Sequence, residues 1–156
     1  MKIYFITGNS NKFKEANEIL SCIPGIELIQ TKIDLPEIQE LDARKIIVAK
    51  LNEAKAQGFY PCFCEDVSLH FDCLNGFPGP LVKWMEQAIG INGMYELLST
   101  YGDKTIRAKC DVGFFEGKEM YFFTGETVGT AVAARGDSFG FDPIFQPKGC
   151  DKTFAE

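Results

Sequence analysis

The first twenty residues constrain the fold most, because they have the pattern of a buried strand that turns directly into a helix. The apolar run at 3–6, Ile-Tyr-Phe-Ile, is followed by Thr-Gly-Asn at 7–9 and by a helix-forming segment over 13–20. Such a turn leaves backbone N–H groups and the positive end of the helix dipole at the break, where anions bind. Lys12 adds a positive charge there. We predict a phosphate-binding element; the alternative is a plain strand-to-helix connection, since the segment is neither a Walker A loop nor a dinucleotide fingerprint.

Strand-like and helix-like segments alternate along the first half of the chain. In chain order we predict a strand at 2–7, a helix at 11–22, a strand at 26–30, a helix at 42–57 and a strand at 61–64. Pro24-Gly25 and Gly58 end the two helices. This alternation favours an α/β layer architecture.

The second half begins with a loop at 74–80 that contains two glycines and two prolines. After it we predict helices at 81–90 and 94–101, then long strands at 105–115 and 120–133 joined by a hairpin turn at 116–119. The aromatic, turn-rich stretch that follows Arg135 has little periodicity. Because no repeat or linker interrupts the pattern, we expect one domain over residues 1–156.

Composition excludes several classes of partner. The chain is 46% hydrophobic and 24% charged, which is typical of a globular domain. Its formal net charge of -6 argues against nucleic acid, because nucleic-acid-binding proteins usually present a basic face. We see no secretion signal or membrane-spanning run, so we expect a cytoplasmic protein with no membrane partner.

The six cysteines, at positions 22, 62, 64, 73, 110 and 150, are expected to be reduced thiols in a reducing cytosol. Cys62 and Cys64 are the only close pair. We expect their thiols to point to opposite faces of a strand and therefore not to share a zinc ion.

Acidic residues come directly after predicted strands. Glu65 and Asp66 follow the strand at 61–64, and open α/β sheets bind ligands at the carboxyl ends of their strands. Glu37 lies in the loop after the strand at 26–30. Carboxylates from separate loops suit Mg²⁺, which keeps several waters and is shared with substrate phosphates. A single acid is more often a solvated surface group, so this prediction depends on the common location of all three.

Two further side chains have both a functional and a structural interpretation. Lys83, which precedes Trp84, is placed to put a second cation at the mouth of a cleft; alternatively Trp84 lies in the core and Lys83 on the outside of a helix. His70, the single histidine, fits a packed or half-exposed strand residue better than a general base.

Residues 139–142, Phe-Gly-Phe-Asp, combine aromatic faces with a carboxylate. Aromatic side chains stack on any nucleobase, and hydrogen bonds to the base edge then select among bases. Core packing of both Phe139 and Phe141 is the alternative.

Taken in order, these segments resemble the inosine triphosphate pyrophosphatase family, also called the Ham1-like or non-canonical purine nucleoside triphosphatases. The matching segments are short and span nearly the whole chain: Thr7-Gly8-Asn9 with Lys12 and Glu15, Leu35-Pro36-Glu37, Glu65-Asp66, residues 76–80 with Lys83-Trp84, and Arg135-Gly136 leading to residues 139–145. The resemblance implies a mixed α/β fold with a long twisted central sheet flanked by helices, and two lobes with a nucleotide cleft between them.

The resemblance also implies an activity. The family hydrolyses nucleoside triphosphates to the monophosphate and pyrophosphate with Mg²⁺, for which Mn²⁺ is a possible substitute. It prefers ITP, XTP and their deoxy forms, and its members are usually homodimers. This reaction needs no histidine, which fits a chain that has only one. A carboxylate can activate the water, and a metal ion and lysines can neutralise the leaving pyrophosphate.

Site residues carried over by position fall into three groups. The phosphate-binding residues would be Thr7, Gly8, Asn9, Lys12 and Lys83, the metal-binding residues Glu37, Asp66 and Glu65, and the base-binding residues Phe139 and Asp142. Asp66 is also similar to the residue proposed to activate water, so Asp66 and Lys12 are the expected catalytic residues.

The chain departs from the family pattern at two places. Val67 stands where many members have Ser or Thr. The family also continues past the equivalent of residues 153–156 into a helix with a lysine and a Ser-His-Arg motif, which this domain is expected to lack. Two other functions stay open: a Maf-like pyrophosphatase acting on pyrimidine or modified nucleotides, and a nucleotide-binding domain without turnover.

Overall fold

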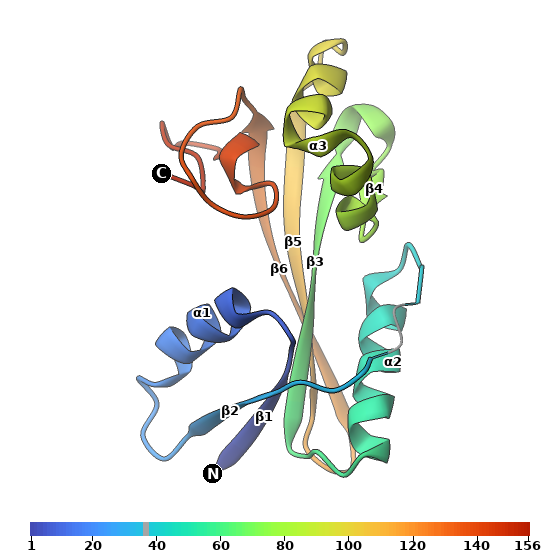
Figure 1. Cartoon of the computed structure of the whole chain (residues 1–156), viewed down its shortest axis with the longest axis vertical. Coiled ribbons are helices and arrows are strands. Elements are labelled where there is room, and N and C mark those ends of the chain that lie inside the picture. The colour runs from blue at the N-terminus through green and yellow to red at the C-terminus, as the bar shows by residue number, and fades with distance from the viewer. Residues whose placement is uncertain (36–37) are drawn as a thin grey trace. The chain divides into compact units, whose positions relative to one another are not determined.

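A computed structural model of the chain describes residues 1–35 and 38–156 (Figure 1). The chain divides into two compact units. The first unit consists of residues 1–66 and 111–124, and the second of residues 67–110 and 125–156. Glu37, an expected metal ligand, lies outside the described residues.

The fold is a mixed α/β structure with a central mixed sheet and flanking helices, as the resemblance implies. The strands are β1 (Lys2–Ile6), β2 (Glu27–Thr31), β3 (Cys62–Phe71), β4 (Pro78–Gly79), β5 (Thr105–Phe115), β6 (Met120–Ala131) and β7 (Phe145–Pro147). The helices are α1 (Ser10–Leu20), α2 (Ala43–Ala56) and α3 (Val82–Ser99), with short 3₁₀ turns at Asp72–Leu74 and Asp142–Ile144. The strand order is β2-β1-β3-β5-β6-β7, and β4 pairs with β3.

The first unit is built around β1, which lies between β2 and β3 and runs parallel to both. Helices α1 and α2 cover opposite faces of these strands (Figure 1). Asn9 caps α1 and Asp42 caps α2, and each side chain accepts hydrogen bonds from the backbone of the first helical turn. The unit is therefore a strand-helix-strand element extended by a second crossover helix, as the alternating sequence pattern predicts.

Helix α2 lies very close to β5. A methyl group added at Gly113 of β5 would lie 2.2 Å from Ile47 Cγ2 and 2.9 Å from Leu51 Cδ1. Ile47 and Leu51 are fully buried, and Phe115 packs in the same core cluster. Glycine is required here because any side chain would occupy space that the helix already fills.

The second unit has a core of its own. Its cluster includes Leu69 and Phe71 of β3, Met94 and Leu98 of α3, and Ile106 of β5. Helix α3 is broken at Gly90, whose φ of 68° and ψ of 170° are not helical. The expected helical segments at 81–90 and 94–101 are therefore present, but they meet at this break and α3 is assigned as one helix.

Strand β3 corrects two predictions. It extends to Phe71 rather than ending at residue 64, so Glu65 and Asp66 lie inside a strand and not at its carboxyl end. Cys62 and Cys64 lie on the same face, because residues two apart on a strand share a face, and both are buried in the core of the first unit. Burial raises the pKa of the Cys62 thiol to about 11 and that of Cys64 to about 12.

β1, β2, β5 and β6 agree with their expected ranges to within a few residues, whereas β4 and β7 lie in segments where no strand was expected. β5 covers Thr105–Phe115, and the turn between β5 and β6 is closed by a hydrogen bond from the Glu116 N–H to the Glu119 carbonyl. None of the helices in residues 1–35 and 38–156 has the length and hydropathy needed to cross a membrane.

Candidate active site

The turn between β1 and α1 is ordered by its own polar side chains. The Thr7 hydroxyl accepts a hydrogen bond from the Asn9 N–H at 3.1 Å. Asn9 Oδ1 in turn accepts from the Asn11 N–H at 2.9 Å and the Lys12 N–H at 3.4 Å. The helix amides expected to face an anion are thus partly satisfied by Asn9. A methyl group added at Gly8 would meet nothing within 4 Å, so the backbone there is open to an approaching group.

Lys12 reaches from the first turn of α1 to the side chain of Glu65 on β3. Their Nζ and Oε1 atoms lie 2.8 Å apart, and the two side chains are 25% and 18% exposed. Because the pair is mostly removed from water, it fixes the lysine ammonium beside the helix N-terminus. Lys12 therefore lies in the first turn of α1, and its predicted role in phosphate binding stays a prediction.

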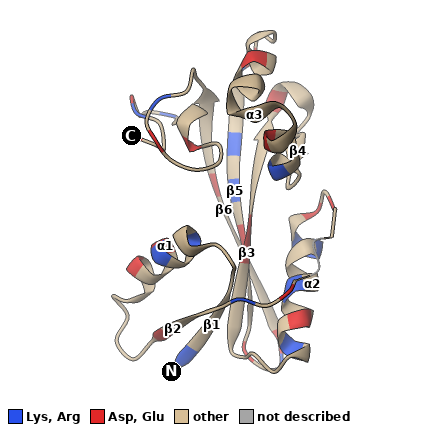
Figure 2. Cartoon of the chain, viewed as in Figure 1, with Lys and Arg blue, Asp and Glu red and all other residues tan. Residues whose placement is uncertain are grey.

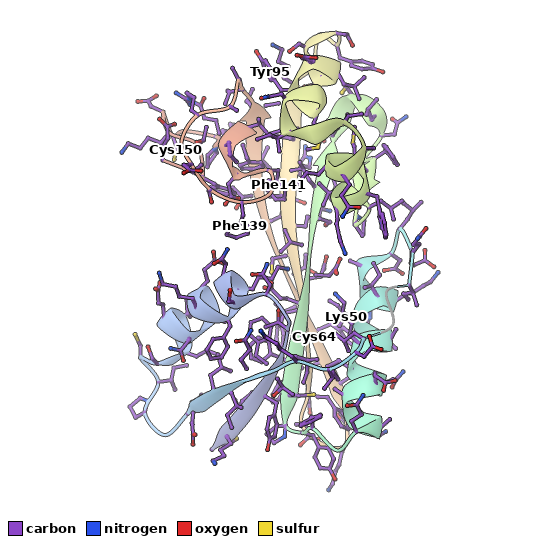
Figure 3. The ribbon with its side chains drawn as sticks, in the orientation of Figure 1. Lys50, Cys64, Tyr95, Phe139, Phe141 and Cys150 are labelled. Carbon is purple, nitrogen blue, oxygen red and sulfur yellow. The ribbon has the colours of Figure 1, made fainter. Side chains whose placement is uncertain are left out.

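Asp66 has a partner that the sequence analysis missed. Lys50 Nζ of α2 lies 2.6 Å from Asp66 Oδ1 and donates a second hydrogen bond to the Glu65 carbonyl at 3.2 Å. The Lys50 and Asp66 side chains are 19% and 17% exposed. Figure 3 shows Lys50 close to Cys64, the neighbour of these acids on β3.

The helical periodicity of α2 contains a signal for Lys50. The buried residues of this helix are Ile46, Ile47, Leu51 and Ala54. Lys50 is four residues after Ile46 and four before Ala54, so it lies on the apolar face of the helix. A lysine on the buried face of an amphipathic helix indicates a buried anionic partner.

Glu65 and Asp66 point to opposite faces of the sheet. Glu65 is paired with α1 through Lys12, and Asp66 is paired with α2 through Lys50. Neighbouring residues on a strand alternate between faces, which explains how two adjacent acids engage two different helices. Basic residues are present on both of these helices (Figure 2).

The strand register places both acids just past the end of β1, where the strand order of the sheet reverses. β1 pairs with β3 through Tyr4↔Cys62 and Phe5↔Phe63, so the last residue of β1 is level with Cys64. The two acids come directly after that level. In the sheet, β2 pairs with one edge of β1 and β3 with the other edge, so the connection from β1 to β2 and the connection from β2 to β3 run in opposite directions across the sheet. Open α/β sheets bind ligands at such a point, where the strand order reverses.

A metal site of three or more acidic, histidine or cysteine side chains is absent from the described part of the chain. A single carboxylate such as that of Asp66 is compatible with Mg²⁺, because this ion is usually held by one or two carboxylates and completes its shell with water and substrate phosphates. Because Glu65 and Asp66 point to opposite faces of the sheet, one of them, and not both together, would provide such a carboxylate.

Lys83 and Trp84 lie in the first turn of α3, in the second unit. Lys83 Nζ is 5.5 Å from the centre of the Trp84 ring. Trp84 is 44% exposed, so the alternative of a core tryptophan is wrong. Both side chains are on the surface of their unit.

The two phenylalanines of the segment 139–142 have different environments. Phe141 is 9% exposed and packs against Phe145, whereas Phe139 is 42% exposed. Figure 3 shows Phe141 within the fold of the second unit and Phe139 projecting from the loop. Core packing therefore accounts for Phe141 alone.

Asp142, three residues after Phe139, is partly buried. Ser138 Oγ donates a hydrogen bond to Asp142 Oδ2 at 2.9 Å. Burial raises the pKa of the Asp142 carboxyl, and the Ser138 hydrogen bond acts in the opposite direction. The carboxylate is thus held in one orientation by its own loop.

Each unit therefore collects its own set of the expected residues. The first unit holds Thr7, Gly8, Asn9, Lys12, Glu65 and Asp66 and adds Lys50; the second holds Lys83, Phe139 and Asp142.

Three solved structures share this fold. A nucleoside-triphosphatase / dITP/XTP pyrophosphatase from Mycobacterium abscessus matches with a TM-score of 0.77 and 24% identity, covering 99% of this chain and 88% of its own. A Ham1 protein from Staphylococcus aureus matches with a TM-score of 0.79 and 23% identity, covering 99% and 85%. A HAM1 protein from Coxiella burnetii matches with a TM-score of 0.81 and 22% identity, covering 99% and 86%.

A family profile gives the sequence-level match. The profile of the Ham1 family matches residues 3–156, which is nearly the whole chain. The chain therefore belongs to the Ham1 family.

Proposed function

We propose that this protein is a Mg²⁺-dependent nucleoside triphosphate pyrophosphatase that hydrolyses ITP, dITP and XTP to the monophosphate and pyrophosphate. The observation that carries the proposal is the pair of lysine-carboxylate contacts, Lys12–Glu65 and Lys50–Asp66, just past the end of β1. Lys12 would give a cation for the triphosphate on the α1 face of the sheet, and Asp66 a carboxylate for water activation on the α2 face, both just past the level at which β1 ends. Membership of the Ham1 family, and the similarity to the dITP/XTP pyrophosphatase of Mycobacterium abscessus, support the same reaction.

In this reaction water attacks the α-phosphorus. The water oxygen forms the new bond to phosphorus, the bond to the bridging oxygen breaks, and pyrophosphate leaves with the electron pair. We assign Asp66 as the base that accepts the proton of the attacking water. Lys50, at 2.6 Å from Asp66 Oδ1, is assigned to hold that carboxylate in position.

The leaving pyrophosphate carries most of the charge that must be stabilised. Lys12 and the turn formed by Thr7, Gly8 and Asn9 are assigned to the triphosphate, because they combine an ammonium with the positive end of α1. Asp66 and Glu65, with Glu37 from outside the described residues, are the candidates to hold Mg²⁺. The ion would supply electrostatic neutralisation of the phosphate oxygens.

Phe139 and Asp142 are assigned to the base. An exposed aromatic ring suits stacking, and a carboxylate fixed by Ser138 suits hydrogen bonding to the edge of a purine. These two roles rest on the family resemblance together with the exposure of Phe139.

The direct test incubates the protein with ITP, XTP, GTP and dTTP and Mg²⁺, and measures pyrophosphate and orthophosphate separately. We expect pyrophosphate as the product, ITP and XTP as the best substrates, and loss of turnover when the metal is chelated. Orthophosphate as the main product would contradict the proposal. A preference for dTTP would favour the Maf-like alternative, and ITP binding without any product would favour a nucleotide-binding domain.

The stacking role of Phe139 has a separate test. Phe139→Ala should raise KM for ITP about 5-fold to 150-fold, which corresponds to a stacking contribution of about 1 to 3 kcal/mol, while kcat changes little. Phe139→Trp, which keeps a stacking face, should remain near the wild-type KM. The assignment of Phe139 fails if the alanine variant keeps the wild-type KM, since its exposed ring contributes little to the core.

A further inference from the structure

The only histidine of the chain packs against the loop that precedes α3. In the register of β3 and β4, His70 is opposite Pro78. A methyl group added at Gly79 would lie 3.4 Å from His70 Cε1, and one added at Gly76 would lie 3.6 Å from His70 Nδ1. The imidazole ring therefore occupies the space beneath both glycines of this loop.

The other side of the ring is held by a buried hydroxyl. Ser68 Oγ and His70 Nε2 are 2.9 Å apart, and Ser68 is 1% exposed. A buried hydroxyl needs a hydrogen-bond partner, and the imidazole provides one. His70 thus connects the interior of the second unit to the glycine loop.

This loop determines where α3 begins. The Phe71 N–H donates to the Phe77 carbonyl at 3.3 Å, and the Leu81 N–H donates to the Pro78 carbonyl at 3.1 Å. Helix α3 starts at Val82, and Lys83 is its second residue. A change in the backbone at 76–79 is therefore transmitted over a few bonds to the Lys83 backbone.

We propose that His70 is a positioning residue that fixes the glycine loop at 76–79 and, through it, the place of Lys83. The proposal rests on the proposed function, in which Lys83 binds a phosphate of the substrate. His70 does not contact the substrate in this proposal; it acts through the loop. An apolar side chain of similar size would fill the volume but would leave the Ser68 hydroxyl without its partner.

The kinetic test combines His70 variants with Lys83→Ala. His70→Leu should raise KM for ITP about tenfold with kcat within about twofold, and His70→Gln, whose amide reaches toward Ser68, should recover part of the loss. In the Lys83→Ala background, His70→Leu should add no further increase in KM. If His70 had a purely structural role, His70→Leu would instead lower the fraction of active protein and hence the apparent kcat. The effects of His70→Leu and Lys83→Ala would then multiply in the double variant. Either result overturns the proposal.

A second measurement needs no turnover. Hydrogen exchange of the Leu81 and Phe71 amides should be faster in His70→Leu than in the wild type, because both amides donate into the loop. Unchanged exchange overturns the anchoring whatever the kinetics show. If the wild-type protein releases no pyrophosphate from any nucleoside triphosphate, the proposed function is wrong. The proposal for His70 can still be tested in that case. Hydrogen exchange then decides whether His70 anchors the loop, and the affinity for inorganic triphosphate, measured by calorimetry, decides whether His70 affects phosphate binding.

Discussion

Asp66→Asn is expected to lower kcat for ITP by about two to four orders of magnitude, because the amide cannot accept the proton of the attacking water. The substitution keeps the size and shape of the side chain, so KM should change much less. The measurement is the rate of pyrophosphate release at saturating ITP and Mg²⁺. Activity near the wild-type level would show that Asp66 is not the base.

The same variant has a predictable effect on stability. Asp66 and Lys50 are 17% and 19% exposed, so removing one charge leaves the other partly buried without its ion pair. We expect a loss of about 1 to 2 kcal/mol in the free energy of unfolding, between the values for exposed and fully buried pairs. The double variant Lys50→Met with Asp66→Asn should recover part of this stability and none of the activity.

Asp111→Asn is the matched control. Asp111 is also a strand aspartate of the first unit, and it accepts a hydrogen bond from Thr124. It has no role in the proposed reaction, so its variant should keep the wild-type kcat. A comparable loss of kcat in both variants would indicate a general effect of removing a carboxylate, and the assignment of Asp66 would fail.

The local elements of this fold could be predicted from sequence because their signals are local. The β1–α1 turn follows from a glycine and a capping asparagine, and the β5–β6 hairpin from its turn residues. The end of β3 could not be predicted, because two acids in succession are typical of a strand end. In the structure each acid is paired with a lysine from a helix on its own face, and the strand continues.

The contacts of the candidate site residues differ in the same way in how far sequence indicates them. Lys12 belongs to the turn that predicts a phosphate-binding element, so local sequence is enough to make it a candidate, while its contact with Glu65 is visible only in the structure. Lys50 contacts a residue sixteen positions away, and its only sequence signal is its place on the apolar face of α2. Phe139 and Phe141 are equivalent in sequence, and only the packing of Phe141 against Phe145 distinguishes them.

Gly113→Val is expected to have the largest effect on stability. Its Cβ would lie 2.2 Å from Ile47 Cγ2 and 2.9 Å from Leu51 Cδ1, and both of these side chains are fully buried. Overpacking of this kind costs about 1 to 3 kcal/mol and occasionally more. For a domain of this size that corresponds to a fall in Tm of about 3 to 12 °C, measurable by thermal unfolding.

The chain contains a matched control for this substitution. Gly125 lies in β6, and a methyl group there would meet nothing within 4 Å. Gly125→Val changes the same residue type in the same kind of element and should leave Tm within a few degrees of the wild type, since β-branched residues favour strands. Equal losses at both positions would show that the cost comes from the strand backbone and not from contact with α2.

Gly113 also connects packing to catalysis. Ile47 and Leu51 flank Lys50 on α2, so a side chain at position 113 that pushes the helix away also moves Lys50 from Asp66. We therefore expect the folded fraction of Gly113→Val to lose about tenfold or more in kcat at a temperature where it remains folded, because displacements near 1 Å in a catalytic site have effects of this order or larger. Ile47→Ala in the same chain should restore both Tm and kcat in part, by giving the new side chain room. If Tm recovers and kcat does not, the position of α2 does not control Asp66, and Lys50 has only a structural role.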